Sequence, residues 1–208
     1  MLLHAGRRRF LKRAGAGGAI VAVGSMFAPS GFLPFAGAQS FTDEDLAAFA
    51  QSIELAAVAA YGMAAAALSS ATKPVGQLFA THHQQHADAF GAVAGSKAVK
   101  GPNQALVTAL TPALQAVKDE KGALELAFGL ENQAAETYAF GLTAATGSDA
   151  VSGMATILPI EAEHAAILGV ALGMSVPDIF VNGAFESAAV GDGSSIKKGL
   201  DPSVFPVS

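Results

Sequence analysis

Apolar residues recur at helical spacing along most of the chain after Thr42, and they mark out four long segments. These lie at about residues 46–68, 75–95, 119–146 and 148–173. Thr42 precedes three acidic residues that suit the first turn of a helix. Pro159 is expected to kink the fourth segment. The pattern therefore predicts four long helices.

The stretch between the second and third segments is different. Gly101-Pro102-Asn103 opens a shorter amphipathic piece within residues 95–120, which we interpret as a long crossover containing its own short helix. After Pro177 the chain becomes mixed and glycine-rich, and we expect residues 175–208 to form a loosely attached C-terminal tail. The composition, rich in alanine and leucine and without tryptophan, also favours packed helices over a sheet.

Two glutamates and two tyrosines repeat along this pattern. Tyr61 and Tyr138, the only tyrosines, each follow a glutamate by seven residues, and these glutamates are Glu54 and Glu131. The two pairs are offset by 77 positions. Each pair lies on one face of an otherwise apolar helix, so both glutamates are expected to face the core. The repeat predicts a duplicated pair of helices.

The helix after each glutamate carries a matching pair of polar residues. His83 and His86 follow the first glutamate, and Glu161 and His164 follow the second at an offset of 78. One extra loop residue accounts for the difference between the two offsets. Residues three positions apart share a helix face, so each pair can reach one ion. His82 is an alternative to His83, although the repeat alignment favours His83.

A carboxylate buried among apolar helices requires compensation. An unpaired charge there costs several kcal/mol, so Glu54 and Glu131 must be protonated, hydrogen-bonded or bound to a cation. Two interpretations remain open, namely a metal site in the core and a metal-free network of Glu, His and Tyr hydrogen bonds. The hydroxyls of Tyr61 and Tyr138 are expected to support the glutamates by hydrogen bonds, with a redox role as the alternative. Three other glutamates fall off the inward faces and are expected to be solvated: Glu125, Glu136 and Glu163.

These residues resemble the ferritin-like superfamily over about residues 42–174, and more narrowly its exported members. The resemblance implies a four-helix bundle with one long crossover, in which each half gives one glutamate and one Glu-x-x-His to a site for two iron or manganese ions. The positions that match are Glu54, His86, Glu131, Glu161 and His164. His83 stands where the family pattern has a glutamate.

That departure changes the expected site. An imidazole cannot bridge two metals as a carboxylate does, and three carboxylates give a charge of −3 in place of −4. A single ion or an uneven pair then becomes the expected occupant. Iron or manganese is favoured, and zinc suits the same donors.

The first 38 residues are typical of an export signal. Arg7-Arg8-Arg9-Phe10-Leu11-Lys12 resembles a twin-arginine motif, with Gly6 where Ser or Thr is common, and Ala36-Gly37-Ala38 offers small residues for cleavage. The alternatives are a retained amphipathic anchor and a basic nucleic-acid arm. A signal of this type predicts the twin-arginine export machinery as a partner and a periplasmic or extracellular location.

Charge and cysteine content exclude other classes of function. Five of the twelve basic residues and none of the seventeen acidic ones lie in the signal, which leaves a net charge of −10 after cleavage. Nucleic acid is therefore not an expected partner. With no cysteine, any metal must be held by imidazole and carboxylate.

The expected function is accordingly an exported ferritin-like protein whose metal ions react with oxygen or peroxide. The alternative is a metal-free structural, stress-protection or interaction bundle. The sequence leaves open whether the protein forms a homodimer.

Overall fold

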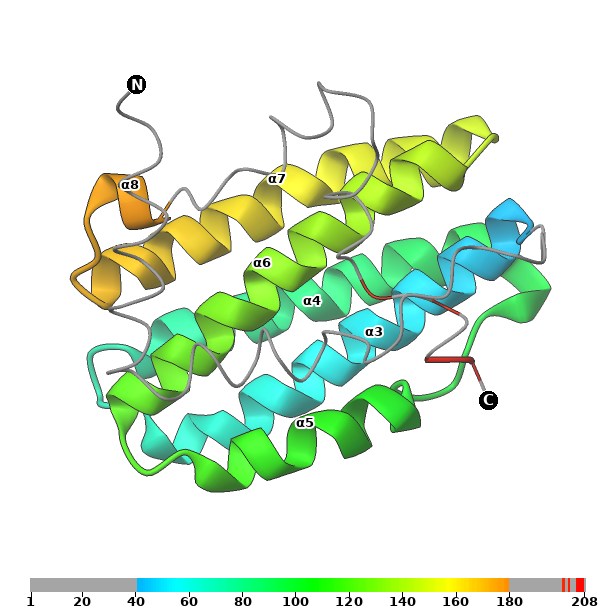
Figure 1. Ribbon diagram of the computed structural model, residues 1–208. Coiled ribbons are helices and arrows are strands. Elements are labelled where there is room, and N and C mark those ends of the chain that lie inside the picture. The colour runs from blue at the N-terminus through cyan, green and yellow to red at the C-terminus, as the bar shows by residue number, and fades with distance from the viewer. Residues whose placement is uncertain (1–40, 180–199, 201, 203–204, 208) are drawn as a thin grey trace, which may run out of the picture.

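The computed structural model describes residues 41–179, 200, 202 and 205–207, and in this part of the chain the regular secondary structure consists of helices alone (Figure 1). The helices are α3 (Asp43–Ala64), α4 (Lys73–Ala94), α5 (Gln104–Ala116), α6 (Glu120–Ala144), α7 (Ser148–Ala171) and the short α8 (Val176–Ile179). Two 3₁₀ turns, η2 (Ala65–Ala67) and η3 (Gly95–Lys97), follow α3 and α4. The predicted all-α class and all four long helices are confirmed.

The four long helices form two antiparallel pairs. Helix α3 packs along α4, α6 packs along α7, and the two pairs face each other across the core (Figure 1). Helix α5 lies in the connection between the pairs and runs along the outside of the bundle against α3 and α6. This is the predicted four-helix bundle with one long crossover, which itself contains a short helix.

The helix boundaries follow from local chemistry. Thr42 and Asp45 form a reciprocal capping box at the start of α3, and the side chains of Asn103 and Asp119 accept backbone N–H groups at the starts of α5 and α6. Helix α4 ends at Gly95, whose φ of +56° is costly for residues with a Cβ. Helix α7 continues through Pro159. The ends of the helices are therefore encoded locally.

Helix α3 contributes several small residues to the core. Ala47, Ala56 and Ala60 are almost fully buried there, so that neighbouring helices approach closely. Two helices, Asp43–Ala67 and Ser148–Ala171, would be long and apolar enough to cross a membrane by length and composition alone. Both pack within the bundle, where core helices are expected to be this apolar.

The described residues near the C-terminus contact the bundle. Leu200 is buried, and its backbone N–H donates to Thr137 Oγ1 at 2.8 Å. The side chain of Asn103 donates to the carbonyl of Phe205 at 2.9 Å, and Phe205 packs against the core. The tail, predicted to be loosely attached, is anchored at these two positions. The predicted export signal, residues 1–38, lies outside the described residues.

The cap of α3 can be tested separately from the core. Replacing Thr42 with alanine removes the acceptor for the Asp45 N–H, and we expect the free energy of unfolding to fall by about 1 kcal/mol. Thr42→Ser keeps the hydroxyl and should stay close to the wild type. Denaturant unfolding followed by circular dichroism measures both variants, and equal losses in the two would contradict this role for the cap.

Candidate metal centre

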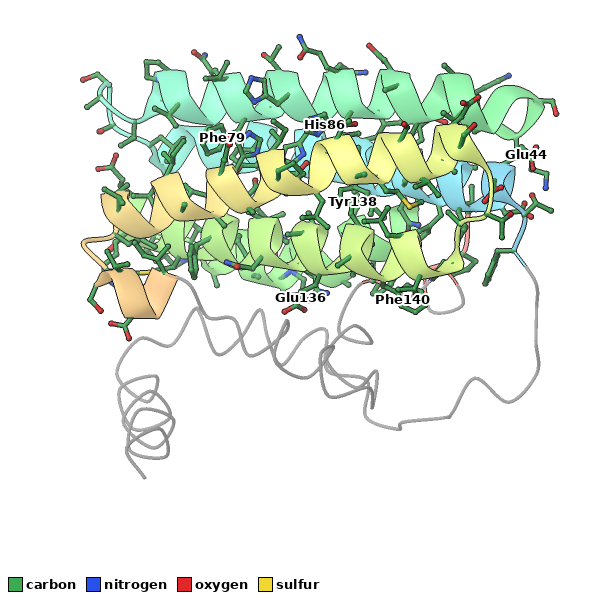
Figure 2. All side chains as sticks on the ribbon, turned by 90° about the horizontal axis from the view of Figure 1, so that it is seen from above. Glu44, Phe79, His86, Glu136, Tyr138 and Phe140 are labelled. Carbon is green, nitrogen blue, oxygen red and sulfur yellow. The ribbon has the colours of Figure 1, made fainter. Side chains whose placement is uncertain are left out.

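All six predicted ligands meet in the middle of the bundle. Helix α3 contributes Glu54, α6 contributes Glu131, and the other four come in pairs from α4 and α7. Five are at most 2% exposed, and only His86 reaches the edge of the core, with its side chain 12% exposed. Figure 2 shows His86, Phe79 and Tyr138 between the helices, whereas Glu136 lies on the outer side of α6.

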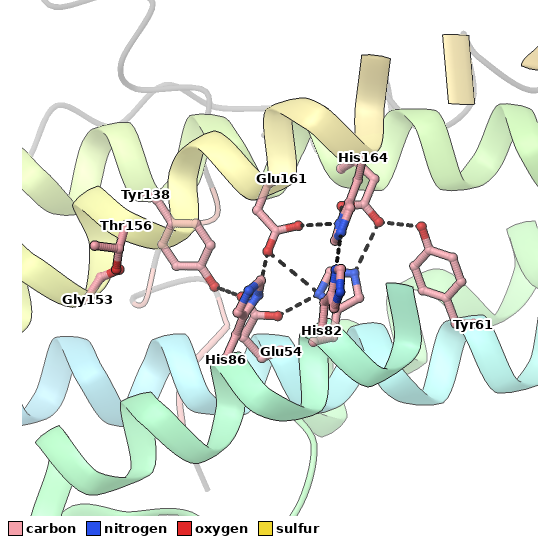
Figure 3. Close-up of polar contacts among 11 residues, drawn as sticks. Glu54, Tyr61, His82, His86, Tyr138, Gly153, Thr156, Glu161 and His164 are labelled. Carbon is pink, nitrogen blue, oxygen red and sulfur yellow. Dashed lines mark hydrogen bonds and ion pairs between the residues drawn. The ribbon is translucent and has the colours of Figure 1, made fainter. Parts of the chain in front are cut away.

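The two tyrosines hold the two glutamates across the bundle. The Tyr61 hydroxyl donates to Glu131 Oε1, and the Tyr138 hydroxyl donates to Glu54 Oε1. Each tyrosine therefore supports the glutamate of the opposite helix pair, and the two mark opposite ends of the cluster (Figure 3). Burial, followed by the neighbouring carboxylates, raises the pKa of both tyrosines well above 10, so their hydroxyls remain donors.

His83 lies between the same two glutamates. Its Nδ1 is 2.6 Å from Glu54 Oε2 and its Nε2 is 3.1 Å from Glu131 Oε1. Burial alone would lower the pKa of His83, but these two carboxylates outweigh burial and raise the pKa well above its usual value. In the metal-free protein His83 can therefore act as a buried cation that donates to both glutamates.

Glu161 differs from the other two glutamates because it has no hydrogen bond. Its Oε1 is 2.8 Å from His86 Nδ1 and its Oε2 is 3.3 Å from His164 Nδ1. Neither contact has the alignment of a hydrogen bond, so both oxygens of Glu161 and the Nδ1 of His86 are buried without a hydrogen-bond partner, although they lie at ion-pair distance. Burial raises the pKa of Glu161, whereas the pKa of Glu54 and that of Glu131 are lowered, since there the histidines outweigh burial.

His164 is fixed from three sides. Its Nδ1 is 3.1 Å from Glu131 Oε2, and its ring stacks on Phe79 with the ring centroids 3.9 Å apart. Its Nε2 is 2.9 Å from Nδ1 of His82, which lies on the outer side of His164. His82 is thus a neighbour of one candidate ligand, whereas His83 is inside the cluster. The sequence alone did not single out this contact or the stacking of Phe79.

The donor atoms form two overlapping groups. In each group the ligand atoms lie within 4.8 Å of one another, and His83 and Glu161 belong to both. The first group adds Glu54 and His86, and the second adds Glu131 and His164. Three carboxylates and three imidazoles are a donor set suited to iron, manganese or zinc. These are the distances expected of side chains that could share an ion.

One glutamate outside the cluster differs from its prediction. Glu125 was expected to be solvated but is only 8% exposed, and it forms an ion pair with Lys121 one helical turn away. The helical pattern alone did not reveal this burial. Glu163 is exposed, as expected, and Glu136 is half-buried.

Comparison with known proteins agrees with this geometry. A ferritin-like domain family matches residues 42–174, which span all four long helices and all six candidate ligands. No curated protein and no solved structure matches the chain. The chain therefore belongs to the ferritin-like domain family.

Proposed function

We propose that the protein binds iron or manganese in the Glu/His centre of its ferritin-like bundle and that the bound metal reacts with oxygen or peroxide. The observation that carries this proposal is the state of Glu161. Two buried carboxylate oxygens and the nearby Nδ1 of His86 lie close together without hydrogen bonds. These atoms are close enough for ion pairing but lack aligned hydrogen bonds, and burying polar atoms in that state is unfavourable; a shared cation would coordinate them.

Each residue of the cluster has a distinct role in the proposed metal site. Glu54, Glu131 and Glu161 supply the negative charge, and His86 and His164 supply neutral nitrogen ligands. Tyr61 and Tyr138 orient the two lone glutamates, while Phe79 and His82 orient His164. The apolar helices around them exclude water. A bound iron or manganese ion would supply the redox chemistry.

The alternative function is a metal-free structural, stress-protection or interaction bundle. It is favoured by the contacts of His83, which can neutralise Glu54 and Glu131 by donating to both. It leaves both oxygens of Glu161 and the Nδ1 of His86 as an ion pair without a hydrogen bond. The metal-bound interpretation accounts for all six side chains, and we therefore prefer it.

Export through the twin-arginine route is part of the same proposal. That route carries folded proteins, so a buried centre could be loaded before export. The supporting observation is the Arg7-Arg8-Arg9-Phe10-Leu11-Lys12 string, which precedes the bundle. The proposed location is periplasmic or extracellular.

Metal binding is the decisive test. Protein refolded with Fe(II), Mn(II) or Zn(II) and then desalted should retain metal, and its melting temperature should rise because the ion binds only the folded state. Glu161→Ala and His164→Ala should lose most of the metal and of the thermal shift. Gln84→Ala, an exposed change on α4, is the matched control. Metal-free wild-type protein with an unchanged melting temperature would exclude the metal function and leave the alternative.

The departure at His83 predicts the number of ions. With three carboxylates we expect the wild type to hold one ion tightly and a second weakly, since a second divalent ion would leave the core with excess positive charge. His83→Glu restores the family pattern and should bind two ions tightly. Calorimetric titration of both proteins with Mn(II) measures the stoichiometry. Two equal, tight sites in the wild type would contradict the expected effect of this residue.

The stability of the metal-free protein should fall as the pH rises. Burial opposes the charge on His86, but Glu161 and Glu54 outweigh burial and raise its pKa from 6.5 to about 9. A group with a raised pKa in the folded state stabilises fully below pH 6.5, and this contribution is lost as the pH rises through about 9.

Urea unfolding of the metal-free protein between pH 6 and 10 measures this loss. We expect the free energy of unfolding to decline across that range, and to decline less in His86→Ala. The pKa of His83 and that of His164 are also raised, so part of the decline should remain in the variant. A metal-free protein whose stability rises over this range would contradict the protonated cluster.

A further inference from the structure

An apolar pocket lies beside the candidate metal centre, next to Tyr61. It has a volume of about 80 Å³ and lies between α3, the start of α4, the first half of α6 and the end of α7. Five alanines contribute to its wall: Ala60, Ala64, Ala123, Ala127 and Ala171. Their small side chains leave space where larger residues would fill the bundle.

The pocket is a direct continuation of the metal centre. Ala127 lies one helical turn before Glu131, and Leu168 lies one turn after His164, so these two lining residues share a helix face with a candidate ligand. Tyr61 forms part of the wall, and its hydroxyl donates to Glu131. Tyr61 therefore belongs both to the pocket wall and to the end of the cluster that it marks in Figure 3.

The other end of the cluster is filled. There Tyr138, the counterpart of Tyr61, stacks on Phe90 with the ring centroids 5.4 Å apart. Both residues are at most 1% exposed, and Met154 packs against the same core. Buried aromatic side chains therefore pack beside Tyr138, whereas a pocket lies beside Tyr61.

The walls of the pocket suit an apolar occupant better than water. Only Tyr61 and Thr72 among its lining residues carry a polar side-chain group, and both hydroxyls already donate, to Glu131 and to Glu120. A water molecule would need two to four polar partners, which this wall does not offer. The rim is open to solvent, because Ile167 is 48% exposed and Val75 is 37% exposed.

Its size limits the occupant to a small molecule. An apolar protein cavity of ~150 Å³ holds benzene or xenon, and this pocket is about half as large. We propose that the pocket is a binding site for dioxygen, through which it enters the bundle on the side of Tyr61 and Glu131. This inference rests on the proposed reaction of the metal centre with oxygen, but the pocket itself can be tested without metal.

Xenon is the probe for the pocket. In metal-free, full-length protein, xenon should shift the methyl resonances of Leu124 and Leu168 in a saturable manner. Ala127→Leu fills the space and should abolish the shifts. Ala171→Leu narrows the exposed mouth and serves as a second variant if the first does not fold. Ala162→Leu is the control, because Ala162 is exposed on α7 and does not line the pocket.

Oxygen uptake tests the role of the occupant. In Fe(II)-loaded protein, the KM for dioxygen should rise several-fold in Ala127→Leu or Ala171→Leu and stay unchanged in Ala162→Leu, with equal iron content in all. Absence of xenon binding, or binding that survives Ala127→Leu, would overturn the site. Xenon binding with an unchanged KM would overturn dioxygen as its occupant. A protein that takes up no iron would contradict the proposed function, and the xenon experiment would still decide whether the pocket binds an apolar molecule.

Discussion

The burial of three carboxylates in an apolar helical bundle is the constraint on which the rest of this structure depends. Glu54, Glu131 and Glu161 are at most 2% exposed, and each would cost several kcal/mol if left unpaired. The chain compensates two of them with tyrosine and histidine donors. The third, Glu161, lies at ion-pair distance from histidine nitrogens that are not aligned for hydrogen bonds. This difference among three otherwise similar residues is what points to a cation.

The tyrosines link the site to the fold. Because Tyr61 donates to Glu131 and Tyr138 donates to Glu54, each helix pair completes the environment of the other pair's glutamate. Association of the two pairs and formation of the site are therefore one event. The two ends nevertheless differ, since Phe90 fills the space beside Tyr138 while alanines leave a pocket beside Tyr61. The two helix pairs thus contribute similar candidate ligands, but the packing around the two tyrosines differs.

His83 sets the charge of the Glu/His cluster apart from that of an all-carboxylate arrangement. The position equivalent to His83 in the second helix pair is occupied by Glu161, and an imidazole in place of a carboxylate lowers the negative charge of the site. In the metal-free protein His83 can serve as the counter-ion of two glutamates, and with metal bound it can offer a nitrogen to either ligand group. The same side chain is therefore compatible with a metal-free core and with the proposed metal-bound one, in which the ion would supply the neutralising charge.

The sequence by itself determined the helices and the six residues that meet in the core. Their apolar periodicity, the Thr42 cap and the repeated Glu, Tyr and His spacing depend only on local geometry, which is why they could be predicted. The tertiary structure decided which partners these residues have. The exchange of tyrosines between helix pairs, the burial of Glu125, the contact of His82 with His164 and the pocket beside Tyr61 all depend on how the helices are placed against each other. The spacing of residues along one helix determines which side chains share a face of that helix. Only the packing between helices determines which side chains of other helices that face contacts.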